Sequence, residues 1–247
     1  MTTQTAPSTT ALDNAPDTDA IRFSPRRAAR IAGVSYLVMF VLAMVANFAV
    51  NQGVFEPGDA TATVANITDS IGMFRLGAVG FLVIAVLDVI IAWALHVVFR
   101  QVNRDVSLAA AWFRLAYSAM LGVAVAPLFQ VIQLVTGGLD VPTDQVATQT
   151  MTAMAHFQTT WLLGLALFGA HLVLVGRLAV RSGLVSRILG NILVLAGIAY
   201  VADTIARMVL PDYQAAAGVF LAVVALPSMI GEGWLGLWLL LSRRIER

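Results

Sequence analysis

The sequence contains no cysteine, and only 12% of its 247 residues carry a charge. The absence of cysteine excludes disulfides, thiolate metal sites and thiol catalysis together. An ordinary soluble domain has about 25% charged residues, whereas 59% of this chain is hydrophobic and its mean hydropathy is +0.84. This composition predicts an integral membrane protein, with the lipid bilayer as its main partner.

Sequence motifs for several soluble chemistries are missing as well. The chain has no phosphate-binding glycine loop, nucleotide fingerprint or cluster of metal ligands, and its net charge of +1 comes from basic residues spread over short loops. We therefore expect no nucleic-acid partner, no cofactor and no metal, and no residue stands out as catalytic. A haem is disfavoured because His96 lies near the end of its apolar run and His171 lies deeper, so the two imidazoles differ in depth.

Six apolar runs are long enough to cross a bilayer, which takes about 20 residues in a helix. The alternating pattern of a membrane β-barrel, in strands of about ten residues, is absent. The sequence thus predicts an all-α, polytopic six-helix bundle over residues 30–247. A tail at 1–29 precedes it, and its Thr- and Pro-rich part buries too little surface to become ordered. The predicted spans are about 31–50, 77–99, 107–136, 157–178, 188–209 and 217–241.

The arginines predict how these helices are threaded. All 15 basic residues are arginine, and twelve of them fall in the N-terminal segment up to Arg30, the turns at 100–104 and 177–187, and the C-terminal end. Cytoplasmic loops of membrane proteins are enriched in basic residues, so both termini are expected on the cytoplasmic side of a bacterial inner membrane. The loops predicted on the other side carry acidic residues instead: Glu56, Asp59, Asp69, Asp140, Asp144 and Asp212.

Two of the acidic loops are long enough to hold local structure. A Pro-Gly turn followed by Asp59 as N-cap predicts a short helix lying on the surface. Pro142 and Asp144 predict a similar helix that leads into the fourth span.

Four of the ionisable residues inside the predicted spans lie at similar depth, on helix faces rich in small residues. Residues three, four or seven apart share a face, and faces with small side chains pack against other helices in lipid. At about 1.5 Å of rise per residue, the two carboxylates lie roughly 15 Å from the cytoplasmic ends and the two basic groups roughly 10 Å. We therefore expect one inward polar cluster made of Asp88, Arg114, His171 and Glu232.

One guanidinium cannot neutralise both carboxylates of this cluster. If Arg114 pairs with one of them, the other is protonated or paired with a protonated His171, because an unpaired buried charge neutralises itself. A carboxyl group with a proton to exchange is what a proton-coupled carrier requires. The alternative is a structural ion pair between Asp88 and Arg114 that fixes the helix register, with Glu232 simply protonated.

A second polar group, nearer the acidic loops, consists of Arg75, Asp203 and Arg207. Asp203 and Arg207 are four residues apart on one helix, which favours a local ion pair over a binding site. Pro227 precedes Glu232 in a glycine-rich stretch. This stretch is consistent with a hinge or an opened turn near Glu232, and also with close helix packing.

Several segments together resemble a family of bacterial multi-pass membrane proteins, DUF4386. They run in order from about Arg30 to Arg243: residues 30–33 (RIAG), 58–67 (GDATATVANI), 74–77 (FRLG) with Asp88, 102–104 (VNR), 113–115 (FRL), 171–172 (HL), 197–203, and Glu232 followed by 237–240 (LWLL). The resemblance implies a six-helix membrane fold without an established activity. It therefore supplies no catalytic residues.

These features favour a membrane protein that binds or moves a small solute or a proton at its inward polar cluster. An alternative is a non-transporting membrane partner or stress-response component that acts through the loop at 58–67. A third hypothesis, with less support, is an intramembrane enzyme that acts on lipid.

Overall fold

Six long helices make up the fold, as the sequence predicts. The computed structural model describes residues 24–242 and 245, and this part of the chain contains no strand. A π-helical turn at Phe48–Gln52 extends the first helix, and a 3-10 turn at Gln214–Ala216 leads into the last. The α-helices are α1 (Pro25–Asn47), α2 (Ala60–Asp69), α3 (Ile71–Phe99), α4 (Arg104–Val135), α5 (Thr143–Ser182), α6 (Arg187–Val209) and α7 (Ala217–Leu241). All of them except the short α2 are long and apolar enough to cross a membrane.

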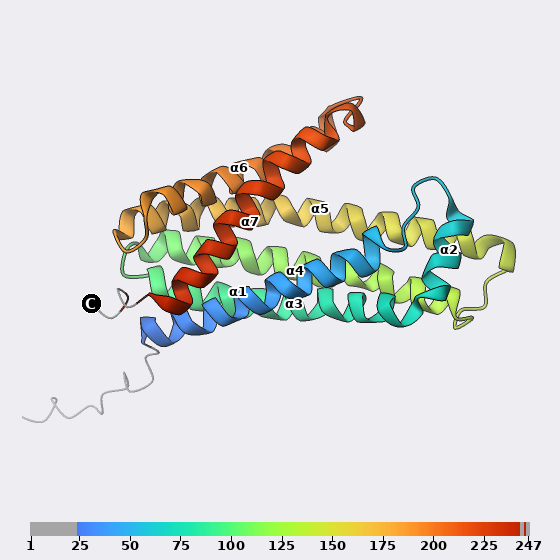
Figure 1. The fold of residues 1–247 in the computed structure, drawn as a ribbon, viewed down its shortest axis with the longest axis horizontal. Helices are drawn as coiled ribbons and strands as arrows, with labels where there is room; N and C mark the ends of the chain where they lie inside the picture. Colours follow the sequence, from blue (N-terminus) through green and yellow to red (C-terminus); the bar gives the residue numbers. More distant parts are fainter. Residues whose placement is uncertain (1–23, 243–244, 246–247) are drawn as a thin grey trace, which may run out of the picture.

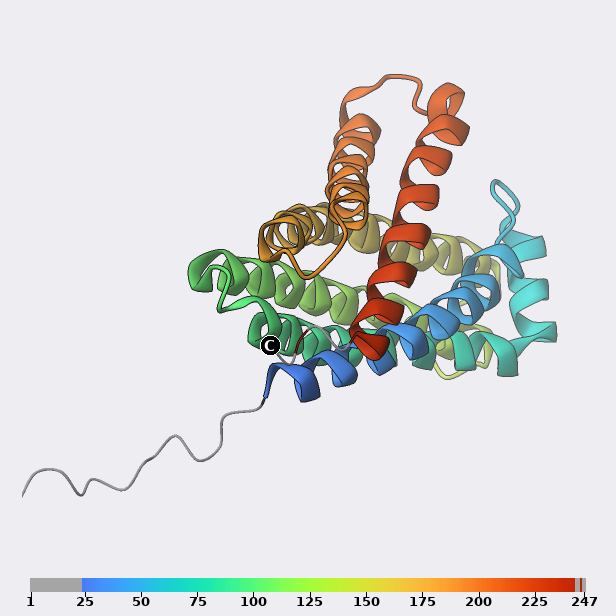
Figure 2. The same cartoon turned by 60° about the vertical axis from the view of Figure 1, so that its left-hand side comes forward.

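The long helices form a closed ring in the order α1, α3, α4, α5, α6, α7 and back to α1 (Figure 1). Helices that follow each other in the chain are neighbours in space, as short connections require. Figure 2 shows α7, in red, between α6 and α1. The short helix α2 lies across one end of the ring against α3, α4 and α5. In this order α3 and α6 stand on opposite sides of the ring.

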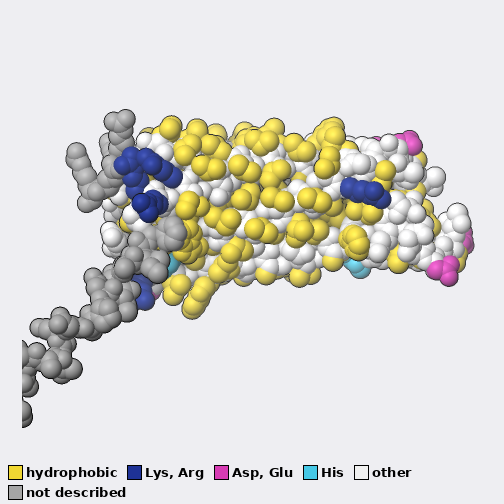
Figure 3. Space-filling view, turned by 90° about the horizontal axis from the view of Figure 1, so that it is seen from below, with side chains coloured by type: hydrophobic (Ala, Val, Ile, Leu, Met, Phe, Trp, Pro, Cys, Tyr) yellow, Lys and Arg dark blue, Asp and Glu magenta, His cyan; other side chains and the backbone are white. Residues whose placement is uncertain are grey.

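The outer surface of the ring is apolar. Val41, Val79 and Leu226 are 61%, 55% and 62% exposed, and many other large hydrophobic side chains are exposed like them. So large an apolar surface marks contact with lipid. Figure 3 shows it as a yellow belt, with arginines gathered at one end and acidic side chains at the other. We call these the arginine-rich end, where the α3–α4 and α5–α6 turns lie, and the acidic end, where α2 and the α6–α7 loop lie.

The first helix begins earlier than predicted. Ser24 accepts a hydrogen bond of 3.4 Å from the backbone N–H of Arg27, and Pro25 occupies the first turn. Serine at the N-cap and proline just inside it are strong start signals. Residues 25–29 of the predicted tail are therefore helical, and the earlier part of that tail lies outside the described residues.

The two predicted loop helices differ in outcome. Asp59 caps α2 as expected, because its carboxylate accepts a hydrogen bond of 2.8 Å from the N–H of Ala62. A helix does begin after Pro142 and lead into the fourth span, as expected, but it is not a short surface helix: Thr143 opens α5, a single helix of 40 residues. No glycine or proline occurs between residues 143 and 157 to break it, so the helix continues without interruption into the membrane span.

Glycines allow α5 and α6 to approach each other backbone to backbone. A Cβ atom on Gly169 would lie 2.5 Å from the carbonyl oxygen of Gly197, and one on Gly176 would lie 2.6 Å from that of Gly190. Real Cβ atoms do not come so close to a backbone oxygen. Small residues at such positions are typical of helix contacts in lipid, where close packing takes over the role of the hydrophobic effect.

Replacing Gly176 by alanine should therefore destabilise the bundle. Forcing a methyl group into this contact costs about 1–3 kcal/mol. Gly122→Ala is the matched control, because nothing lies within 4 Å of a Cβ at that position, and it should stabilise α4 by about 0.5–1 kcal/mol. Reversible unfolding of the purified protein in mixed micelles measures both changes. Equal effects of the two variants would contradict the close α5–α6 contact.

Candidate functional site

The buried guanidinium of Arg114 is the centre of the polar cluster. Arg114, on α4, is fully buried, as is Asp88 on α3. The Nε and Nη2 atoms of Arg114 lie 2.8 Å and 2.6 Å from the same carboxylate oxygen of Asp88, Oδ1. Two charges in so apolar a site are tolerated because they neutralise each other over two charge-assisted contacts.

The remaining N–H groups of Arg114 reach α1 and α5. Nη1 donates to the hydroxyl of Tyr36 at 2.7 Å and lies 3.1 Å from Nε2 of His171. Nη2 also lies 3.7 Å from the sulfur of Met39. All five N–H groups of the guanidinium are therefore directed at acceptors within the protein.

The contacts of His171 define its protonation. Its Nδ1 lies 2.8 Å from the carbonyl oxygen of Ala110, which can only accept a hydrogen bond. Nδ1 therefore carries the proton, and Nε2 is free to accept from Arg114. An imidazolium would instead direct an N–H at the guanidinium. His171 is thus neutral, and it is not the cation that balances a second carboxylate.

Aromatic rings cover both sides of the guanidinium. The Cζ atom of Arg114 lies 4.9 Å from the ring centre of Tyr36 and 5.1 Å from that of Phe168. Cation–π contacts of this length stabilise a desolvated cation. The cation is held by rings, a carboxylate and neutral acceptors together, and α1, α3, α4 and α5 all contribute.

A cavity of about 400 Å³ opens beside this cluster. Asp88 lines it, and the second carboxylate oxygen, Oδ2, has no hydrogen-bond partner among the described residues. Most of the wall is apolar, with hydroxyl groups from Tyr36, Tyr117, Tyr200 and Ser228. The cluster therefore holds one buried, unpaired acceptor beside a space large enough for a small molecule.

Glu232 faces the same cavity from α7. Its side chain is half-buried and lines the wall with Ser228 and Gly233. Neither hydrogen bonds nor ion pairs reach its carboxyl group from the part of the chain that the structure describes. The structure thus brings Arg114 into direct contact with Asp88 and His171, and Glu232 lines the same cavity without a hydrogen bond to them.

The predicted outer group does not form as a unit. Arg207 and Asp203 form an ion pair of 3.0 Å on α6, as their spacing predicts. Arg75 is exposed on α3, on the opposite side of the ring, and does not join them. Tyr213 takes its place: it donates a hydrogen bond of 2.6 Å to Asp203, and its ring stacks with Arg207 at 4.3 Å. Burial and the hydrogen bond to Asp203 raise the pKa of Tyr213 to about 12.

His96 lies apart from the cluster, near the arginine-rich end. Its Nδ1 lies 3.0 Å from the hydroxyl oxygen of Ser107, across the α3–α4 turn. This contact ties the ends of two helices together. Within residues 24–242 and 245, no group of three or more His, Cys, Asp or Glu is arranged to hold a metal ion.

Sequence reasoning did not find the aromatic part of the site. Tyr36 and Phe168 carry no charge and resemble ordinary core residues in an apolar run. A signal exists for Tyr36, because it lies three and seven residues after Gly33 and Ala29, on the small-residue face of α1. A tyrosine on such a face has a hydroxyl that needs a partner inside the bundle.

The fold and site define a class: an integral membrane protein built as a ring of six helices around a buried arginine and a mostly apolar cavity. The chain belongs to a family described as a domain of unknown function, DUF4386, whose profile matches residues 31–242. An uncharacterised protein of Archaeoglobus fulgidus is 26% identical over 166 residues, covering 67% of this chain and 83% of that protein. Similar chains thus occur in an archaeon. No solved structure matches the chain.

Removing the cation of the cluster should be strongly destabilising. Arg114→Met leaves the Asp88 carboxylate, the Tyr36 hydroxyl and His171 Nε2 without their donor, and breaking a buried pair in this way costs about 3–5 kcal/mol. Combining it with Asp88→Asn should recover part of the loss. Arg207→Met, which breaks the partly exposed pair on α6, should cost less than about 1 kcal/mol. Unfolding in mixed micelles compares the three, and similar losses for Arg114 and Arg207 would argue against the central role of Arg114.

Proposed function

We propose that this membrane protein binds a small solute in the cavity and exchanges a proton at Glu232. The observation that carries the proposal is the charge count around the cavity: two carboxyl groups face it and one arginine serves them. Arg114 gives both of its charge-assisted contacts to Asp88. Glu232 is left to be balanced by a proton or by a bound ligand.

The position of Glu232 favours this function over a purely structural role. A structural acid is usually enclosed by donors, as Asp88 is on one oxygen. Glu232 is half-buried at the wall of a cavity of about 400 Å³ instead. A carboxyl group at a cavity wall can gain or lose its proton without unpacking the bundle, which is the requirement for a coupling site.

Infrared spectroscopy tests whether Glu232 exchanges a proton. In lipid-reconstituted protein we expect a protonated carboxyl band that shifts when H₂O is replaced by D₂O. Glu232→Gln should remove this band. Glu56→Gln, the same chemical change on an exposed residue near α2, should leave it in place. A band that is missing in the unmodified protein, or one that does not shift in D₂O, would leave Glu232 with a structural role and overturn the proposal.

We further propose that the protein resides in a cytoplasmic membrane with both termini inside. Twelve of the 15 arginines belong to the segment up to Arg30, the two turns and the C-terminal end that share one side of the predicted threading, and positive residues remain on the cytoplasmic side. The polar cluster would therefore lie in the half of the bilayer nearer the cytoplasm.

Reporter fusions test this orientation. Alkaline phosphatase, which is active only outside the cytoplasm, should be inactive when fused after Arg247 and active when fused after Asp140, in the α4–α5 loop. Green fluorescent protein at the two positions should give the reverse pattern. Phosphatase activity at the C-terminus would show that the bundle is inserted the other way round.

A further inference from the structure

The helices α1 and α7 cross at one end of the ring and diverge at the other. A Cβ atom on Gly33 would lie 2.9 Å from the carbonyl oxygen of Gly236, so the two backbones touch near the arginine-rich end. Toward the acidic end α7 leans away, as Figures 1 and 2 both show. Along this arm the side chains are open to the surroundings: Val219 is 67% exposed and Leu221 is 68% exposed.

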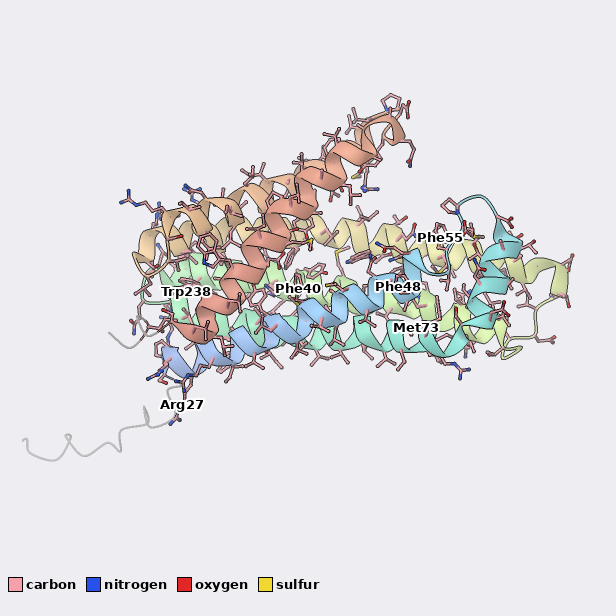
Figure 4. The ribbon with its side chains drawn as sticks, in the orientation of Figure 1. Arg27, Phe40, Phe48, Phe55, Met73 and Trp238 are labelled. Atoms are coloured by element: carbon pink, nitrogen blue, oxygen red, sulfur yellow. The ribbon has the colours of Figure 1, made fainter. Side chains whose placement is uncertain are left out.

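The cavity lies in the opening between these two helices. Its lining residues on α1 and α7 continue from the crossing toward the acidic end, from Tyr36 to Asn47 on one side and from Glu232 back to Leu221 on the other. In Figure 4, Phe40 lies on α1 beyond the crossing, whereas Trp238 on α7 lies near the arginine-rich end. The opening is flanked by lipid-facing surface, so a molecule dissolved in the bilayer reaches Glu232 from the side.

The cavity has more acidic groups than basic ones at its polar end. Asp88 on α3 and Glu232 on α7 face it, with Arg114 on α4 as the nearby cation. The other titratable groups around Glu232 are the tyrosines of α1, α4 and α6 and the neutral His171 of α5, none of which supplies a positive charge. One carboxylate is therefore available to a cation.

The same contacts exclude an anion. Every N–H group of Arg114 is already directed at Asp88, Tyr36, His171 or Met39, so the guanidinium has no donor left for a phosphate or a carboxylate ligand. Most of the rest of the wall is apolar or aromatic, including Phe40, Trp161 and Phe168, and its remaining polar residues are uncharged. Aromatic faces attract organic cations and provide no anchor for anions.

We infer that the cavity takes up a lipophilic organic monocation from the bilayer, through the opening between α1 and α7, with Glu232 as its counter-ion. The inference rests on the proposed proton exchange at Glu232. On binding, the O–H bond of the Glu232 carboxyl group breaks, the proton passes to water, and the carboxylate remains paired with the cation. The net charge of the occupied site equals that of the protonated site, so the exchange adds no uncompensated charge to the membrane interior.

Tetraphenylphosphonium and tetraphenylborate are a matched pair of probes, because they share size and shape and differ in the sign of their charge. Isothermal titration of the detergent-solubilised protein should show saturable binding of tetraphenylphosphonium and none of tetraphenylborate. In weakly buffered solution the binding should release about one proton per cation, by the neutral exchange described above.

Two pairs of variants locate the binding. Glu232→Gln should weaken tetraphenylphosphonium binding at least about tenfold, because it removes a counter-ion in a medium of low dielectric, and should abolish proton release. Glu56→Gln should leave both unchanged. Ala225→Trp adds a large side chain at the cavity wall on α7 and should also block binding. Val219→Trp, on the same helix but facing outward, should not.

The outcomes separate this inference from the proposed function. If the infrared band of Glu232 exchanges in D₂O but tetraphenylphosphonium does not bind, or tetraphenylborate binds equally well, the ligand class is wrong and the proton site stands. If the band does not exchange, both fail. Binding that survives Ala225→Trp overturns the route between α1 and α7. A bound lipid that tetraphenylphosphonium does not displace makes the cavity a lipid site and also overturns the inference.

Discussion

One guanidinium group holds the ring of helices together from inside. Arg114 projects from α4 and contacts Asp88 on α3, Tyr36 on α1 and His171 on α5, so four of the six long helices meet at one side chain. In lipid, apolar side chains gain little by choosing one helix partner over another. A buried cation with directed donors does discriminate, because each wrong arrangement leaves a polar group without a partner. The cluster therefore specifies which faces of these helices turn inward.

The six spans could be predicted from the sequence, because a run of about 20 apolar residues crosses a bilayer as an α-helix. The sequence also brought together the charged members of the cluster, since a charge in a span has to face inward. The sequence did not predict contacts that involve uncharged residues or helices far apart in the ring. In the sequence Tyr36 resembles an ordinary core residue, whereas in the structure its hydroxyl accepts a hydrogen bond from Arg114. Arg75 was grouped with Asp203 by depth alone, and depth does not say on which side of the ring a helix stands.

The two carboxyl groups at the cavity illustrate how environment divides one chemistry into two roles. Asp88 is fully buried and has an arginine on one oxygen, so its ionised form is built into the fold. Glu232 sits on the helix with the most exposed outer arm and has no such partner within the described chain. The proposed proton exchange at Glu232 rests on this difference. His171 is the other basic residue of the cluster, and in its neutral form it cannot act as a counter-ion for Glu232.

The lean of α7 makes the bilayer itself part of the cavity wall. Near the arginine-rich end, the contact between Gly33 and Gly236 fixes the spacing of α1 and α7. Farther along, the spacing depends on what fills the wedge between them, and in a membrane that is the lipid. A hydrophobic helix adjusts its tilt to the thickness of the surrounding hydrocarbon at a cost of fractions of a kcal/mol per Å. We therefore expect membrane thickness and acyl-chain packing to influence the width of the opening, so that the geometry of the cavity depends on the bilayer as well as on the sequence.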